Sequence, residues 1–382
     1  MRTKKKASAS VDIRSYFKKF DKATVFFAMA LSVCGLVAIM SSVVADSSKA
    51  RCLPVQIGGI ALGIVAMLII SKIDYELICD LWIFIIIFSS AALLFTAIFA
   101  DNQGGNYNWI TIAGINIQTS EFTKIAFVIT ISTHIMRLGD RLNKPLSILI
   151  LGAHFMMYFI PVVLQHDLGS SLIYIGIFVT LLFIAGVNLR YFAAGITLIA
   201  AAAPIIWEYL RTDQKKRIIY GFQPELDPLG YGYQPLVAKM ALGSGQMSGL
   251  GYGQGIQTQN SLLPANHTDF VYAIIGEEFG FVGCMIVLVL MVLLVISIFA
   301  NLKRINSVNG RLICVGIASI VIYQTLINLG MVLGLSPVIG VTLPFVSYGG
   351  SSILSLFIAL GVLQSVRIKE STEKTLRFGE NK

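Results

Sequence analysis

Charged residues are scarce in this chain of 382 residues. Only 13% of the residues are Asp, Glu, Lys or Arg, while 56% are hydrophobic. Soluble globular domains carry about 25% charged residues, so the composition excludes a soluble fold and indicates an integral membrane protein. Because one transmembrane helix takes roughly 20 apolar residues, the length allows about ten.

Disulfide frameworks and metal-binding patterns are absent as well. The five cysteines show no close pairing and are interpreted as small, mostly apolar side chains. No Cys/His spacing suggests zinc, and no Walker or dinucleotide-binding pattern is present. The net charge of +9 needs no nucleic-acid partner, because the positive residues stand beside the ends of apolar runs. We therefore expect no nucleic-acid binding.

Ten apolar runs predict an all-α polytopic membrane protein with ten transmembrane helices and a large extracytoplasmic loop, residues 210–269, between helices seven and eight. The runs fall near residues 22–45, 54–72, 78–100, 120–137, 148–165, 168–187, 191–209, 270–300, 311–334 and 343–366.

The distribution of Lys and Arg predicts the orientation in the membrane. Residues 1–21 are basic, and the apolar stretch after them has no small-residue cleavage pattern, which indicates a retained first helix. With this end inside, most of the 29 Lys and Arg fall in inner loops and tails. Both termini are therefore expected in the cytoplasm. Residues 22–366 are expected to form one membrane domain, followed by a cytoplasmic tail, 367–382, that is expected to be polar and flexible from Lys369.

Polar residues gather on the predicted outer face. Glu121 and Lys124 are three apart at the start of the fourth run and share one helix face. They either form an ion pair that fixes the helix or line a cavity, where Lys124 could contact an anionic head group. Asp167 could cap the sixth helix or face the same cavity. Trp109 is an aromatic anchor at the interface or has a specific role.

The long loop carries the basic cluster Lys215-Lys216-Arg217, followed by Lys239 and a glycine-rich run, residues 243–255. Such a cluster suits phosphate or pyrophosphate, because Arg makes forked contacts with phosphate oxygens. The alternative is a solvated or lipid-bound surface. The glycines allow close backbone approach to a ligand, without identifying one.

Asp269 ends this loop, just before the eighth run. A partly desolvated carboxylate can have a raised pKa and act as a general base; the alternative is a helix cap. Glu277 and Glu278, further into the run, need polar partners or an aqueous cavity. The Gly- and Pro-containing segment 328–352 fits close helix packing or the broken helices of a transporter.

Taken together, these motifs resemble the SEDS family of bacterial cell-wall proteins, which includes rod-shape, division and sporulation members. The resemblance runs from the second run to the end of the tenth. The residues that carry it are Trp109, Gln118 with Ser120-Glu121-Phe122-Thr123-Lys124, Gln165 with Asp167-Leu168-Gly169, Arg217, Asp227-Pro228 with Gly232-Tyr233-Gln234, Leu263-Pro264 with His267-Thr268-Asp269-Phe270, and Pro344-Phe345 with Ser347-Tyr348-Gly349-Gly350-Ser351-Ser352.

The resemblance implies a peptidoglycan glycosyltransferase that polymerises lipid II at the outer face of the cytoplasmic membrane, for cell elongation or division. On this resemblance Asp269 is the catalytic base, and Arg217, Lys124 and Lys239 hold the leaving pyrophosphate, with Mg²⁺ or Mn²⁺ as a candidate cofactor. The other residues expected to contact substrate are Glu121, Trp109, Asp167, His267 and Ser347.

The implied partners are a class B penicillin-binding transpeptidase, other proteins of the cell-wall synthesis complex and membrane lipid. Two alternatives stay open: a flippase for lipid-linked precursors, and a scaffold for the transpeptidase. The outer-face clustering favours the polymerase, because an alternating-access carrier should place its site near the bilayer midplane. The motifs do not separate elongation, division and sporulation members.

Overall fold

In the computed structural model, residues 16, 18–100, 107–112 and 115–379 are described, and most of them are helical. The basic residues before 16 and parts of the 101–119 loop lie outside this range, so the predictions made for them are not addressed. Each predicted apolar run contains one long helix. The helices are α2 (Lys22–Ala45), α3 (Cys52–Ile70), α5 (Trp82–Phe99), α6 (Thr119–Leu138), α7 (Pro145–Leu164), α8 (Leu168–Ile184), α9 (Leu189–Tyr209), α13 (Val271–Leu302), α14 (Val308–Val332) and α15 (Gly350–Gly379).

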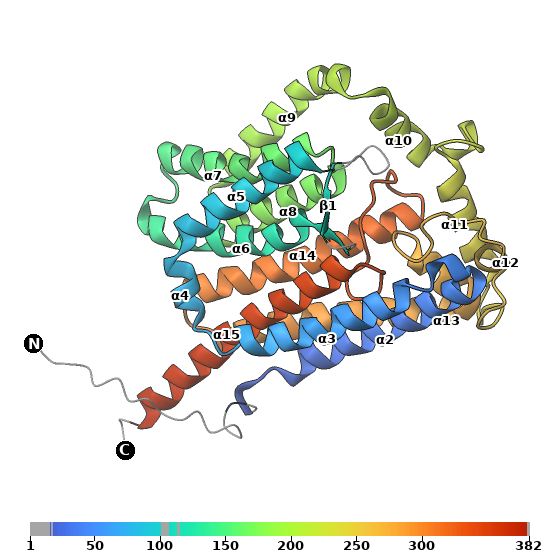
Figure 1. The fold of residues 1–382 in the computed structure, drawn as a ribbon. Helices are drawn as coiled ribbons and strands as arrows, with labels where there is room; N and C mark the ends of the chain where they lie inside the picture. The colour runs from blue at the N-terminus through green and yellow to red at the C-terminus, as the bar shows by residue number, and fades with distance from the viewer. Residues whose placement is uncertain (1–15, 17, 101–106, 113–114, 380–382) are drawn as a thin grey trace, which may run out of the picture.

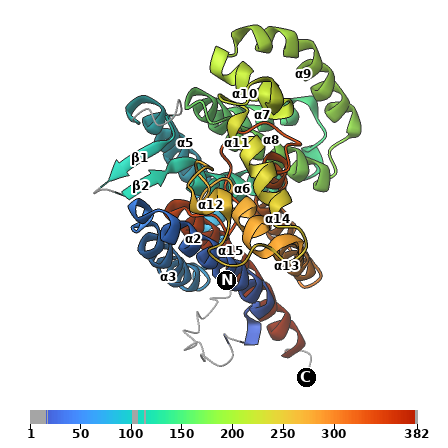
Figure 2. The same ribbon diagram turned by 90° about the vertical axis from the view of Figure 1, so that its right-hand side faces the viewer.

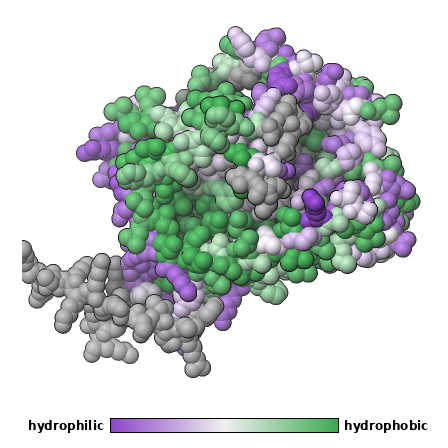
Figure 3. Space-filling view, viewed as in Figure 1, coloured by the Kyte–Doolittle hydropathy of each residue, from purple (hydrophilic) through white to green (hydrophobic). Residues whose placement is uncertain are grey.

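The apolar character of these helices makes the chain a multi-pass membrane protein. Among the described residues, seven helices are long and apolar enough to cross a membrane, and two shorter apolar helices cover Leu168–Ile184 and Leu189–Ile205. Helix α6 falls below this level of hydropathy, because it carries an ion pair and several hydroxyl side chains. A space-filling view shows a broad apolar area over the helices, with hydrophilic side chains gathered at opposite ends (Figure 3).

Short elements complete the chain. They are η1 (Ser47–Lys49), α4 (Tyr75–Asp80), the strands β1 (Trp109–Ile112) and β2 (Ile115–Gln118), η2 (Gly139–Arg141), α10 (Thr212–Phe222), η3 (Pro224–Leu226), α11 (Tyr233–Ser244) and α12 (Ile256–Gln259). The two strands form an antiparallel hairpin. The long segment between α9 and α13 thus contains four short helices, α10, η3, α11 and α12, joined by turns and loops.

Two groups of helices pack around α14. Helices α2, α3, α13 and α15 pack together on one side, α5 to α8 on the other, and α14 contacts α6, α8, α13 and α15 (Figure 1). The most extensive contact between helices joins α3 to α15, where a Cβ on Gly63 would lie 2.7 Å from the ring of Phe357. Glycine at this position lets the two helices meet, as expected where apolar solvent gives little drive for association.

The start of α2 and the end of α15 lie at one end of the bundle, while α10, α11 and α12 cover the other (Figures 1 and 2). At the first end Arg367 pairs with Asp21 at 3.2 Å, and the Glu370 carboxylate accepts hydrogen bonds from the backbone N–H groups of Asn306 and Ser307. Helix α15 continues past the expected end of the tenth run at residue 366, to Gly379; the flexibility expected of the tail from Lys369 stays a prediction.

Two predicted helix boundaries are also wrong. The tenth run was expected to be helical from residue 343, yet α15 begins at Gly350. Pro344 has no N–H to donate, Phe345 has φ +62°, and the Leu343 N–H donates to Ser347 Oγ at 2.8 Å, so the chain turns before the helix starts. In the third run, α4 ends at Asp80 and α5 begins at Trp82.

Helix α13 is broken at Gly280, where φ is +65°. The loop before α12 fills the break: the N–H groups of Leu250 and Gly251 donate to the carbonyls of Glu277 and Glu278, at 3.0 Å each. This pairing satisfies backbone groups that the break leaves free. The prediction of one continuous helix over 270–300 missed it, because the partner segment lies about 30 residues earlier in the chain.

The two carboxylates beside the break have protein partners. Glu277 accepts hydrogen bonds from the backbone of Gln257 at 2.6 Å and from the backbone and hydroxyl of Thr258 at 3.0 and 2.7 Å. Glu278 accepts one from the Ser41 hydroxyl of α2. Both side chains are buried. Glu277 holds the outer segment against α13 and Glu278 joins α13 to α2, although Glu278 Oε2 has no hydrogen-bond partner among the described residues.

Candidate active site

Asp269 sits in a tight turn between α12 and α13. The Ala265 carbonyl accepts hydrogen bonds from the N–H groups of Thr268 at 3.2 Å and Phe270 at 3.3 Å. This turn is tied to the turn before α15: Tyr348 N–H donates to the His267 carbonyl at 2.9 Å. The two turns therefore form one unit that presents Asp269 at the end of the bundle covered by the outer helices.

The Asp269 carboxyl is partly buried, and desolvation raises its pKa to about 6. The positive charge of Arg217 opposes this shift, and the negative charge of Asp167 adds to it. A carboxylate with this pKa is ionised at neutral pH and basic enough for proton abstraction. Residue Phe270 occupies the N-cap of α13 with no side-chain capping bond, so Asp269 does not serve as the helix cap.

Arg217 comes from α10, and of the three basic residues there it is the one whose charge acts on Asp269. Lys215 stands over the Trp207 ring, 5.9 Å from its centroid, and Lys216 over the Tyr231 ring at 5.7 Å. Both lysines therefore stabilise the outer segment through cation–π contacts. The basic cluster predicted from the sequence thus divides into one residue at the site and two beside it.

Lys239 projects from α11 across the backbone that follows α14. A Cβ on Gly334 would lie 2.2 Å from Lys239 Cε and 2.7 Å from Nζ, so only glycine leaves room for this side chain. Within the described residues, no carboxylate oxygen lies within salt-bridge distance of Nζ. The ammonium group is available for a ligand.

Asp167 caps α8, as one of the two sequence interpretations predicted. Its Oδ1 accepts from Ser170 N–H at 2.9 Å, and its Oδ2 accepts from Ser170 Oγ at 2.8 Å, Asn108 Nδ2 at 2.9 Å and Gln118 Nε2 at 3.0 Å. The buried carboxylate therefore joins the β hairpin to α8. Trp109 lies directly opposite Gln118 in that hairpin; its predicted contact with substrate stays a prediction.

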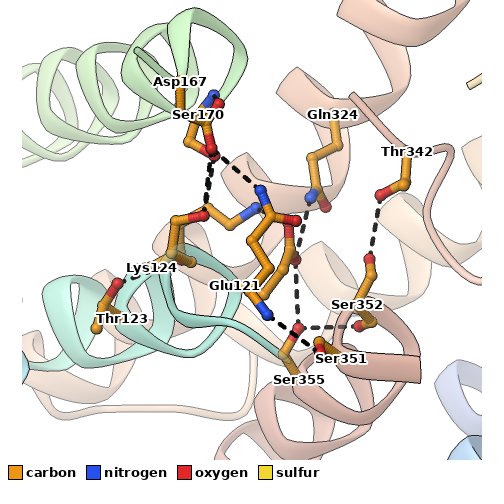
Figure 4. Close-up of polar contacts among 12 residues, drawn as sticks. Glu121, Thr123, Lys124, Asp167, Ser170, Gln324, Thr342, Ser351, Ser352 and Ser355 are labelled. Carbon is orange, nitrogen blue, oxygen red and sulfur yellow. Dashed lines mark hydrogen bonds and ion pairs between the residues drawn. The ribbon is translucent and has the colours of Figure 1, made fainter. Parts of the chain in front are cut away.

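Glu121 and Lys124 form a buried ion pair, with 2.7 Å between Oε1 and Nζ. The second carboxylate oxygen accepts long hydrogen bonds from Gln324 Nε2 of α14 at 3.5 Å and Ser355 Oγ of α15 at 3.4 Å. The pair thus lies where α6, α14 and α15 meet (Figure 4). Among the described residues, Lys124 Nζ donates a hydrogen bond only to Glu121. Its other N–H groups could therefore donate to an anion.

His267 and Ser347 have structural contacts. Burial and the charge of Lys49 lower the pKa of His267 to about 4, so its imidazole is neutral at pH 7, packed 5.4 Å from the Tyr348 ring. Ser347 Oγ donates to the Thr268 carbonyl at 2.5 Å. These bonds explain Ser347 as a tie between the two turns; substrate contact by either residue stays a prediction.

Metal binding by protein side chains finds little support. No group of three or more His, Cys, Asp or Glu side chains among the described residues converges as a ligand set. Asp269 is a single carboxylate, and the oxygens of Asp167 are engaged by neighbouring donors. These residues do not fit a protein-held Mg²⁺ or Mn²⁺ ion.

Two amides at the site were not predicted individually. Gln324 and Asn328 lie four residues apart on α14, buried, each with a side-chain oxygen that has no hydrogen-bond partner. A polar amide within an apolar run marks a helix face turned towards other polar groups. This signal is visible in the sequence, although it does not show what the amides contact.

Comparison with known proteins decides the family. The model of the FtsW, RodA and SpoVE proteins, described as cell cycle proteins, matches residues 21–372. The chain belongs to this family. Peptidoglycan glycosyltransferase MrdB of Escherichia coli K12 is 34% identical over 317 residues, covering 81% of this chain and 84% of that protein. Stage V sporulation protein E of Bacillus subtilis is 31% identical, covering 80% and 84%.

The fold also matches solved structures. A chain of a peptidoglycan synthase complex that coordinates polymerization and crosslinking has a TM-score of 0.80 and 24% identity, covering 92% of this chain and 98% of its own. Rod shape determining protein RodA of Thermus thermophilus has a TM-score of 0.70 and 22% identity, covering 91% and 96%. The predicted membership of the rod-shape, division and sporulation family is thus confirmed.

Proposed function

We propose that this FtsW/RodA/SpoVE family member is a peptidoglycan glycosyltransferase that polymerises lipid II at the outer face of the cytoplasmic membrane. Relatives with this activity in their names cover most of the chain. The observation that carries the proposal is Asp269: a partly buried carboxyl with a pKa raised to about 6, under the influence of Arg217.

In the proposed reaction, Asp269 accepts the proton of the 4-hydroxyl on the acceptor sugar. The hydroxyl oxygen forms a bond to the anomeric carbon of the donor, and the bond from that carbon to the pyrophosphate oxygen breaks. Undecaprenyl pyrophosphate leaves with the electron pair. A base with a pKa near 6 is deprotonated at pH 7 and ready for each cycle.

The cations of the site stabilise the leaving group. Arg217 comes from α10, and its charge acts on Asp269. Lys239 of α11 and Lys124 of α6 are assigned to the same role by the family resemblance. Charge that develops on the pyrophosphate is best stabilised by donors fixed in advance. Since the protein side chains do not form a ligand set, the role of Mg²⁺ or Mn²⁺ stays a prediction in which pyrophosphate oxygens supply the ligands.

The proposed topology has ten transmembrane helices, both termini in the cytoplasm and residues 210–269 outside. The start of α2 and the end of α15 lie at one end of the bundle, and α10 to α12 lie at the other (Figure 1). The predominance of Lys and Arg near the first end fits the positive-inside rule. The bactoprenol tail of lipid II would then stay in the bilayer while its sugars reach Asp269.

A class B penicillin-binding transpeptidase is the proposed partner, within a larger cell-wall synthesis complex. The fold match to a chain of a peptidoglycan synthase complex supports this pairing. Polymerisation and crosslinking would then take place side by side on the outer membrane surface.

The test is polymerisation of lipid II by the purified protein, with and without its transpeptidase. Wild type should form glycan strands, folded Asp269→Asn none, and Glu225→Gln, an exposed carboxylate of the same outer segment, as many as wild type. Equal strands from Asp269→Asn would refute the assignment of the base. No strands from wild type under either condition would favour the flippase or the scaffold.

A further inference from the structure

Asn328 makes the most specific contacts of the residues that the proposed reaction does not use. It lies fully buried within α14. Its Nδ2 donates to the backbone carbonyl of Asp269 at 2.8 Å and to that of Val341 at 2.7 Å. Its Oδ1 has no hydrogen-bond partner. Both donors of one amide are thus used on the backbone around the candidate base.

We propose that Asn328 is a positioning residue, whose amide fixes the backbone of Asp269 so that the carboxylate meets the acceptor hydroxyl. This inference rests on the proposed function, because it assumes that Asp269 is the base. Asn328 itself touches neither the substrate nor the reacting atoms in the proposed reaction.

The two bonded carbonyls lie close to the Asp269 side chain. One is the carbonyl of Asp269 itself. The other, that of Val341, follows Gly340, where a Cβ would lie 3.6 Å from Asp269 Oδ2. The amide of Asn328 therefore ties the backbone of Asp269 to the segment that lies next to its carboxylate.

Other ties keep the turn in place when this clamp is removed. Tyr348 N–H and Ser347 Oγ hold the carbonyls of His267 and Thr268, on the side of the turn that precedes Asp269. Loss of the Asn328 donors should therefore move the carboxylate without detaching the turn. A displacement of about 1 Å at a reacting group can cost about 100-fold in rate.

The test uses Asn328→Leu, which keeps the branched shape and removes both donors. The matched control is Asn309→Leu on the same helix: Asn309 is also buried, its Oδ1 also lacks a partner, and its bond to Thr133 is long at 3.4 Å. We expect kcat for lipid II polymerisation to fall about 100-fold in Asn328→Leu, with KM within about threefold, and both constants to stay near wild type in Asn309→Leu.

Several outcomes would overturn the inference. A kcat for Asn328→Leu equal to that of Asn309→Leu, or a loss confined to KM, would leave Asn328 a purely structural residue. If Asn328→Leu does not fold, Asn328→Gln keeps the donors on a longer stem. An unchanged kcat there refutes the inference, and a lower kcat at unchanged KM supports it.

Asp269→Asn in the same assay separates the two proposals. Strands from Asp269→Asn equal to those of wild type would refute the assignment of the base, and with it the group that Asn328 is said to position; no strands from wild type would refute the proposed function. Full activity in Asn328→Leu together with an inactive Asp269→Asn would refute the positioning role alone.

Discussion

Replacement of Asp269 by Asn should abolish polymerisation and stabilise the fold. The folded-state pKa of Asp269 is raised from 3.8 to about 6, so the folded protein prefers the neutral carboxyl. The stability that this preference contributes is fully present below pH 3.8 and is lost as the pH rises through 6. Above pH 6 the ionised carboxylate costs up to about 3 kcal/mol, less to the extent that the partly accessible side chain is screened.

Asparagine is neutral at every pH and should recover this energy. We therefore expect Asp269→Asn to melt a few degrees above wild type at pH 7.5, and the difference to shrink as the pH is lowered towards 4. The measurement is thermal unfolding of both proteins in the same membrane mimetic, over a series of pH values. A lower melting temperature at pH 7.5, or a gain that does not depend on pH, would refute the reasoning.

Asp167 supplies the matched contrast. Its carboxylate accepts hydrogen bonds from Ser170, Asn108 and Gln118, so Asp167→Asn replaces an acceptor by a donor facing other donors. The expected cost is about 1–3 kcal/mol. The two aspartates should thus shift the melting temperature in opposite directions, and shifts of the same sign would mean that their environments have been misjudged.

Three further predictions follow from single contacts. Arg217→Gln removes the charge that lowers the pKa of Asp269, so the acid limb of the pH–rate profile should move about one pH unit upward. Arg217→Lys keeps the charge and should leave the limb in place. An unmoved limb in Arg217→Gln would contradict the assignment of Asp269 as the base. Lys124→Met leaves the buried Glu121 carboxylate unpaired and should cost about 3–5 kcal/mol. Thermal melting should show most of this loss regained when Glu121→Leu is added, and a double variant no better than the single one speaks against the pair. Gly280→Ala, at φ +65° with its Cβ 2.3 Å from a backbone nitrogen, should cost about 1–3 kcal/mol or more. Gly139→Ala has φ +48° in open space and is the control; equal melting temperatures would show that crowding plays no part.

The apolar runs predicted every long helix, because burial in lipid demands a continuous apolar segment with its backbone satisfied internally. This requirement does not determine where a helix starts, because a turn can also provide hydrogen-bond partners for the backbone N–H and C=O groups. At residues 343–349 the Ser347 hydroxyl provides that alternative, and at Gly280 a distant loop does so. Both exceptions depend on a partner that periodicity cannot identify.

The residues of the candidate site were predicted largely through the family motifs. Their order along the chain does not show which polar groups face one another. Ser347 belongs to a motif as specific as that of Asp269, yet its hydroxyl is used on the backbone of the neighbouring turn. Asn328 stands inside an apolar run, where its amide could only be expected to find some partner. Three-dimensional contacts distinguish the residues that hold the site from those free to act.

Residues that hold the site and residues that are free to act differ in how many of their hydrogen-bonding groups the protein already uses. The carboxylates of Asp167 and Glu277 are occupied by donors from the protein, and such groups stabilise the fold. Lys124 and Lys239 retain donors, and Asp269 keeps an accessible carboxyl with a raised pKa. Asp269 is desolvated and feels the positive charge of Arg217. Such an arrangement costs energy in the empty protein and stabilises the charge that develops when substrate reacts. Desolvation of the Asp269 carboxylate also predicts that its replacement stabilises the protein. The melting experiment and the polymerisation assay therefore both test this desolvation.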